Sequence, residues 1–131
     1  MITEKQWIIG ILLFNEVEVL DFAGPFEVFS ITTYSDTDNK PFTVKTISET
    51  GNMINARNGL KIKPDYNFND KINFDILIIP GGYGAEKIEI YNLKVIEWIK
   101  NQFNNVDILA SVCTGSFLLA KTGILDNKNV T

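Results

Sequence analysis

The hydrophobic positions of the chain fall into short continuous runs separated by polar loops. Three of these runs, at residues 7–14, 75–80 and 107–112, are almost wholly apolar. A continuous apolar run of this length is typical of a strand that is covered on both faces of a parallel sheet. The pattern therefore predicts three buried strands, with residues 7–14 as the central one.

Each apolar run is followed by a segment in which apolar residues recur at the spacing of a helix. The apolar spacing over residues 26–31 predicts the first helix, with Pro25 included in its first turn, where a missing N–H is tolerated. The second is predicted over residues 93–103 and the third beyond Gly115. Strand and helix thus alternate along the chain.

The region between the first helix and the second apolar run carries weaker β signals. Residues 42–48 alternate apolar and polar positions, which predicts a less buried strand. Residues 53–62 predict a small hairpin that turns at Asn58-Gly59, and residues 66–72 are loop-like. The whole order of elements predicts a single α/β domain with an open, mostly parallel sheet and helices on both faces.

Composition narrows the functional classes. The 131 residues are 45% hydrophobic, carry a formal charge of −4 and include one arginine, Arg57, so a nucleic-acid partner is not expected. No segment has the length of a membrane span, and residues 7–14 lack the cleavage pattern of a signal peptide. One cysteine cannot form an internal disulfide, and with no histidine a zinc site would need carboxylates for its other ligands. We therefore expect a cytoplasmic protein without a metal.

The single cysteine, Cys113, lies between the third strand and the helix that follows it. At such a bend the free N–H groups of the helix N-terminus stabilise a thiolate, which is the position of a nucleophile, and the backbone is expected to be strained. The alternative is that Cys113 is a small buried hydrophobe that only packs. The chain has no histidine, so a proton partner must be a carboxylate, tyrosine, lysine or water.

Two other segments also follow the carboxyl ends of predicted strands. Asp21 lies beyond the first, and residues 80–84, with three glycines, lie beyond the second. Ligands of open α/β sheets bind at this edge, so we expect both segments to meet Cys113 there. Each has a plainer explanation: the glycines suit an ordinary strand-to-helix turn, and Asp21 suits a helix N-cap.

Three motifs carry a resemblance to a known family. The segments FNEVEVLDFAGPFEVF (14–29), DILIIPGGYG (75–84) and SVCTGSFLLAKTGIL (111–125) resemble the ThiJ/PfpI family. Within that family, the chain resembles the branch that contains isocyanide hydratases and the ligand-sensing domains of AraC-type regulators. In this branch a threonine follows the cysteine, as Thr114 does here. The resemblance implies a flavodoxin-like fold of the kind found in class I glutamine amidotransferases.

The resemblance also implies roles for individual residues. Cys113 becomes the nucleophile and Asp21 the carboxyl group beside its sulfur. Donors for developing charge come from Thr114, through its N–H and hydroxyl, and from the glycines that line the pocket: Gly81, Gly82 and Gly115. The implied reaction is the hydration of an isocyanide to an N-substituted formamide, without a cofactor. The alternatives are attack on an α-oxoaldehyde or a glycated group, and a non-catalytic sensor of oxidants or of a small ligand.

Similar sequences continue past the position of Thr131, so residues 1–131 are expected to form one domain without the family's C-terminal elements. Apolar surface left uncovered by that difference would favour association. Because family members usually pair, a homodimer is expected. The other expected binding partner is the substrate, a small electrophilic molecule.

Overall fold

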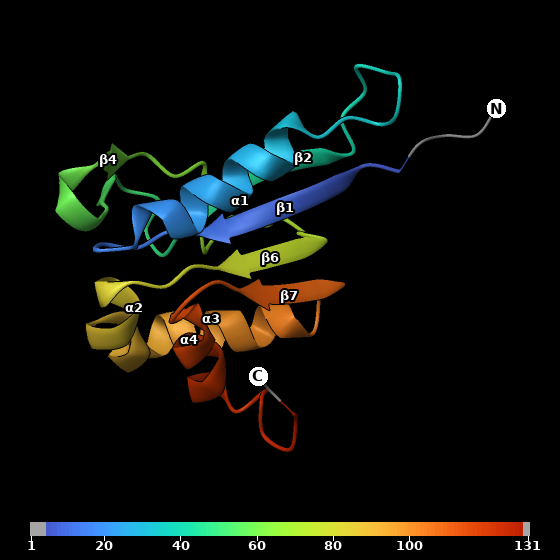
Figure 1. Cartoon of the computed structure of the whole chain (residues 1–131). Helices are drawn as coiled ribbons and strands as arrows, with labels where there is room; N and C mark the ends of the chain where they lie inside the picture. The colour runs from blue at the N-terminus through green and yellow to red at the C-terminus, as the bar shows by residue number, and fades with distance from the viewer. Residues whose placement is uncertain (1–4, 130–131) are drawn as a thin grey trace.

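The computed structural model describes residues 5–129, and its centre is a five-stranded sheet in the order β5-β2-β1-β6-β7 (Figure 1). Every neighbouring pair in this sheet is parallel. The predicted α/β fold with a mostly parallel sheet is confirmed. The strands are β1 (Trp7–Leu12), β2 (Phe42–Ser48), β5 (Tyr66–Asn67), β6 (Ile76–Ile79) and β7 (Ile108–Ser111).

Strand β1 is the central strand, as its continuous apolar run predicted. It pairs with β2 on one side and with β6 on the other. Its residues Ile9 and Ile11 are fully buried, each at 0% exposure, because both faces of the sheet are covered at this position. Gly10 lies against the ring of Phe74, where an added Cβ would come within 2.8 Å of the ring. The middle of the sheet is therefore closely packed against Phe74.

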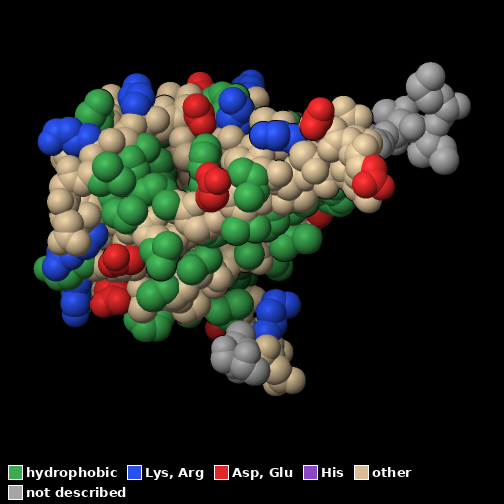
Figure 2. All heavy atoms as spheres, turned by 45° about the horizontal axis from the view of Figure 1, so that its top comes forward, with side chains coloured by type: hydrophobic (Ala, Val, Ile, Leu, Met, Phe, Trp, Pro, Cys, Tyr) green, Lys and Arg blue, Asp and Glu red, His purple; other side chains and the backbone are tan. Residues whose placement is uncertain are grey.

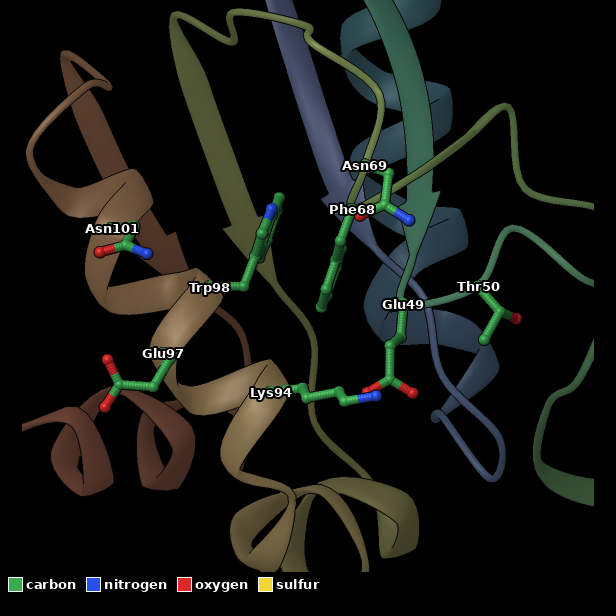
Figure 3. Close-up of a pocket in the computed structure, with 8 residues that line it drawn as sticks. All are labelled: Glu49, Thr50, Phe68, Asn69, Lys94, Glu97, Trp98 and Asn101. Atoms are coloured by element: carbon green, nitrogen blue, oxygen red, sulfur yellow. The ribbon is translucent and has the colours of Figure 1, made fainter.

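Helices cover both faces of the sheet. Helix α1 (Val19–Ile31) packs on β1 and β2, while α3 (Leu93–Phe103) lies on the opposite face and contacts α4 (Gly115–Thr122) (Figures 1 and 3). The short helix α2 (Tyr83–Lys87) and the 3-10 turn η2 (Glu89–Tyr91) connect β6 to α3. Within residues 5–129, no helix combines the length and the hydrophobicity that crossing a membrane requires.

The predicted start of the first helix is wrong. Helix α1 begins at Val19, so Pro25 lies in the helix interior and not in the first turn. The start is set by the loop before it: the Glu18 N–H donates to the Gly81 carbonyl at 3.0 Å, and the Asp21 N–H then donates to the Glu18 carbonyl at 3.2 Å. Pro25 has no N–H, so the Asp21 carbonyl loses its ordinary helical donor. This earlier start places Asp21 in the first turn.

The smaller β elements match the sequence pattern in part. The hairpin is confirmed as β3 (Ile54–Asn55) and β4 (Lys61–Ile62), joined through the 3-10 turn η1 (Arg57–Gly59) with Asn58 at φ 67°. Strand β5 lies within the segment expected to be a loop, because pairing with β2 orders it. Strand β7 was expected to be buried, but it forms the edge of the sheet and Ile108 is 51% exposed.

Candidate active site

Cys113 occupies the bend between β7 and α4. Its φ of 53° places a non-glycine residue in the left-handed region, which is the strained backbone expected at this position. The bend is closed by a hydrogen bond from the Gly115 N–H to the Val112 carbonyl at 3.0 Å. The thiol side chain is exposed, so Cys113 is not a buried packing residue. The bend therefore presents the sulfur to solvent beside the N-terminus of α4.

Two glycines allow backbone segments to meet at this bend. A Cβ on Gly115 would lie 2.1 Å from the Ile79 carbonyl oxygen, and a Cβ on Gly81 would lie 2.5 Å from the Thr114 backbone nitrogen. Real Cβ contacts are never so short, so neither position accepts a side chain without a shift of the backbone. The end of β6 and the start of α4 are thus held in direct backbone contact, which fixes the place of Cys113 relative to the glycine loop.

The three segments predicted to converge at the carboxyl edge of the sheet do so. The Gly81 N–H donates to Asp21 Oδ2 at 3.1 Å, and the Gly82 N–H donates to Thr114 Oγ1 at 3.0 Å. Gly82 has a φ of 115°, a conformation that favours glycine. The glycine loop therefore joins the first turn of α1 to the N-terminus of α4. In Figure 1 the arrowheads of β1, β6 and β7 point to this same end of the sheet.

These hydrogen bonds differ from the expected roles in two respects. Asp21 does not cap α1, since the N-cap is Glu18 and the Asp21 carboxylate instead accepts from the glycine loop. Among the described residues, no hydrogen bond joins that carboxylate to the Cys113 sulfur. Both glycine N–H groups already have protein acceptors. The site therefore holds its proposed members in one place without a direct bond between acid and nucleophile.

An ion pair that the sequence analysis missed anchors the loop before α1. Arg57 Nη1 lies 2.5 Å from Glu16 Oε2, and the guanidinium lies 5.0 Å from the centre of the Tyr83 ring. The Glu16 carboxylate raises the pKa of Arg57. The Gly84 N–H also donates to the Glu16 carbonyl at 3.0 Å. Glu16 therefore links the hairpin to the glycine loop. In the sequence, the ion pair was indicated only by the presence of one arginine in the chain and two glutamates in the loop before α1.

Metal ligands are not grouped in the described part of the chain: between residues 5 and 129, no three His, Cys, Asp or Glu side chains are placed to hold a metal ion. The chemistry available at the bend is that of a thiol, a carboxyl group, a hydroxyl group and backbone N–H groups.

The sequence and the structure were compared with known proteins. The model of the DJ-1/PfpI family matches residues 8–131. An isonitrile hydratase of Pseudomonas putida is 30% identical over 123 residues, which cover 94% of this chain and 50% of that protein. The HTH-type transcriptional regulator GbdR of Pseudomonas aeruginosa is 27% identical over 118 residues, or 90% of this chain and 31% of the regulator.

Among solved structures, a ThiJ/PfpI family protein from Pseudomonas syringae matches with a TM-score of 0.80 at 20% sequence identity. The match covers 91% of this chain and 47% of that one. At this level of identity the likeness concerns the fold. The chain thus spans about half the length of the hydratase and of the solved structure, and about a third of the regulator.

Proposed function

The chain belongs to the DJ-1/PfpI family, and on this premise we propose that it hydrates an isocyanide to an N-substituted formamide with Cys113 as the nucleophile. The proposal rests on one observation above all: Cys113 is exposed, in the left-handed conformation, at the N-terminus of α4. The similarity to an isonitrile hydratase supports the choice of substrate class.

The reaction divides into two steps. The Cys113 thiolate attacks the terminal carbon of R–NC, and a proton added to that carbon gives a thioimidate in which the carbon is bound to sulfur. Water then adds to the same carbon, the sulfur leaves as thiolate, and R–NH–CHO is released. The sum is one isocyanide and one water for one formamide, so the reaction consumes no oxidant or reductant.

Asp21 is the proposed proton donor of the first step. Its carboxyl group reaches the glycine loop that lies against Thr114, the residue next to Cys113. Because Asp21 makes no hydrogen bond to the sulfur in this structure, the proton passes to the substrate carbon only when the substrate occupies the space between them. Thr114 supplies its backbone N–H for charge that develops during attack.

The test is turnover of an aliphatic isocyanide by the purified protein, followed as formamide production. Cys113→Ala abolishes turnover, and Asp21→Asn lowers the rate by about 10²–10⁴, the usual contribution of a general acid. Asp36→Asn, an exposed aspartate in a distant turn, is the matched control and leaves the rate unchanged. Turnover that survives Cys113→Ala would refute the nucleophile.

A second candidate function is ligand sensing, because a transcriptional regulator is among the similar proteins. In that case the wild-type protein turns over neither isocyanides nor α-oxoaldehydes, while Cys113 still reacts with thiol reagents. An assay with both substrate classes separates the two functions. We also propose a cytoplasmic location, because a single cysteine that acts as a free thiol suits a reducing compartment.

We also propose a homodimer that pairs through the outer face of α1. Leu20, Val28 and Ile31 share this face and are 75%, 60% and 62% exposed. In Figure 2 the top of Figure 1 is turned toward the viewer. Hydrophobic side chains gather on the face that this view shows. Apolar residues on the outer side of a helix, which the monomer leaves uncovered, are typical of a surface that pairs.

A further inference from the structure

A cavity lies on the opposite face of the sheet from α1, apart from the Cys113 site. It has a volume of about 550 Å³, within the usual range for small-molecule sites. The chain between β5 and β6 crosses this face without forming a helix, which leaves a hollow between that connection and α3 (Figure 3). None of the residues that line it belongs to the Cys113 site.

An aromatic pair lies at the centre of the cavity. The rings of Phe68 and Trp98 are stacked with their centres 4.3 Å apart and their planes at 1°. Figure 3 shows the two rings side by side between α3 and the connection that leaves β5. Both side chains are only partly buried and pack on the edge of the core. Because the two rings cover each other's inner faces, a ligand meets their apolar edges and outer faces, and an indole ring also attracts a cation.

Negative charge predominates around this aromatic pair. The cavity is lined by two carboxylates, Glu49 and Glu97, and by one ammonium group, Lys94. Behind Glu49 lies the buried Glu89, and the Asn92 side-chain amide donates to both, at 3.3 Å to Glu49 Oε1 and 3.0 Å to Glu89 Oε2. This end of the cavity therefore attracts a cation. A phosphate or carboxylate ligand would be attracted by one lysine and repelled by these carboxylates.

Lys94 is the one cation among the residues that line this cavity. Its side chain extends toward Glu49 in Figure 3, yet within the described part of the chain the two form no ion pair. The neutral polar residues Thr50, Asn69 and Asn101 complete the wall, and their side-chain oxygens can accept from an ammonium N–H. The cavity combines an apolar floor, a negative end and neutral acceptors.

We propose that this cavity binds a small organic ammonium ion, with its apolar body along Phe68 and Trp98 and its charge facing Glu49. The site is separate from Cys113, so it acts as a second binding site whichever function Cys113 performs. Lys94 competes with the ligand for the same carboxylates, and removing it strengthens binding.

The experiment uses Trp98 fluorescence. The chain has two tryptophans, so a Trp7→Phe background leaves Trp98 as the only indole. Three probes with the same aromatic body are titrated: phenethylamine, 2-phenylethanol and 3-phenylpropionate. Phenethylamine gives a saturable change, and the neutral and anionic probes bind more weakly. Equal affinity for all three probes, or no saturation by phenethylamine at millimolar concentration, overturns the proposal.

Variants with opposite expected signs complete the test. Glu49→Gln weakens phenethylamine binding and Lys94→Gln strengthens it, each by about twofold to fivefold, as expected for partly solvated charges. Glu27→Gln is the matched control, because this exposed glutamate lies on α1, across the sheet, and it leaves the affinity unchanged. All three side chains are at least partly exposed, so the variants are expected to fold. Shifts of equal sign for Glu49→Gln and Lys94→Gln would also overturn the proposal.

Discussion

Leu20→Glu should convert the proposed homodimer into a monomer. Full burial of a leucine side chain contributes about 1.5–3 kcal/mol. Leu20 is 75% exposed in the single chain, so a partner that covers it adds about 1–2 kcal/mol per copy and about 2–4 kcal/mol per symmetric dimer. Loss of even the smaller value raises the dissociation constant by about 30-fold, before the cost of burying two carboxylates is added.

The assay is sedimentation velocity or light scattering over a range of protein concentrations. The control is Leu93→Glu, because Leu93 is 73% exposed but lies on α3, on the other face of the sheet. The two substitutions change the same side chain at nearly the same exposure, so only the location differs. A wild-type monomer at micromolar concentration, or equal effects of the two variants, would refute the role of the α1 face.

Two further predictions concern stability. Gly115→Ala places a Cβ 2.1 Å from the Ile79 carbonyl and should lower the free energy of unfolding by at least the ~1–3 kcal/mol usual for overpacking, measured by urea titration; an unchanged midpoint would contradict the backbone contact. Burial raises the pKa of the Glu89 carboxyl; the hydrogen bond from Asn92 opposes this, and the Glu49 carboxylate adds a smaller rise. A carboxyl with a raised folded pKa contributes stability that is present at low pH and lost as pH rises from its ordinary range through the raised pKa. Glu89→Gln should therefore reduce the fall of the unfolding free energy with rising pH and stabilise the protein at neutral pH. The exposed control Glu97→Gln should do neither. If the unfolding free energy of Glu89→Gln fell with pH as steeply as that of the wild type, the role of Glu89 would be refuted.

Strand pattern and helix periodicity predicted most of the fold because burial is a property of whole segments. Residues 42–48 and 93–103 form elements with the bounds that the pattern indicated. The start of α1 was missed because a loop contact sets it, from the Glu18 N–H to the Gly81 carbonyl 63 residues later. The exposure of β7 was missed because position at a sheet edge depends on strand order, which periodicity does not encode.

The site was predictable at the level of segments but not of bonds. Parallel strands carry whatever follows them to one edge, so Asp21, the glycine loop and Cys113 could be placed together from the order of elements alone. Which N–H meets which oxygen depends on shifts of about an ångström that a sequence does not specify. The Glu16 to Arg57 pair shows the same limit, since its partners are 41 positions apart.

The hydrogen bonds at the bend decide which groups remain available for chemistry. Gly81 and Gly82 donate their N–H groups to Asp21 and Thr114, so these donors hold the loop in place in the free protein. The Thr114 N–H makes no hydrogen bond within the described residues, and it follows directly after Cys113. On the proposed mechanism it is therefore a donor that can meet charge beside the sulfur without first breaking a hydrogen bond. The glycine loop then acts chiefly by positioning α4. On the proposed mechanism, the Asp21 carboxyl accepts from Gly81 through Oδ2 and would deliver its proton through the other oxygen.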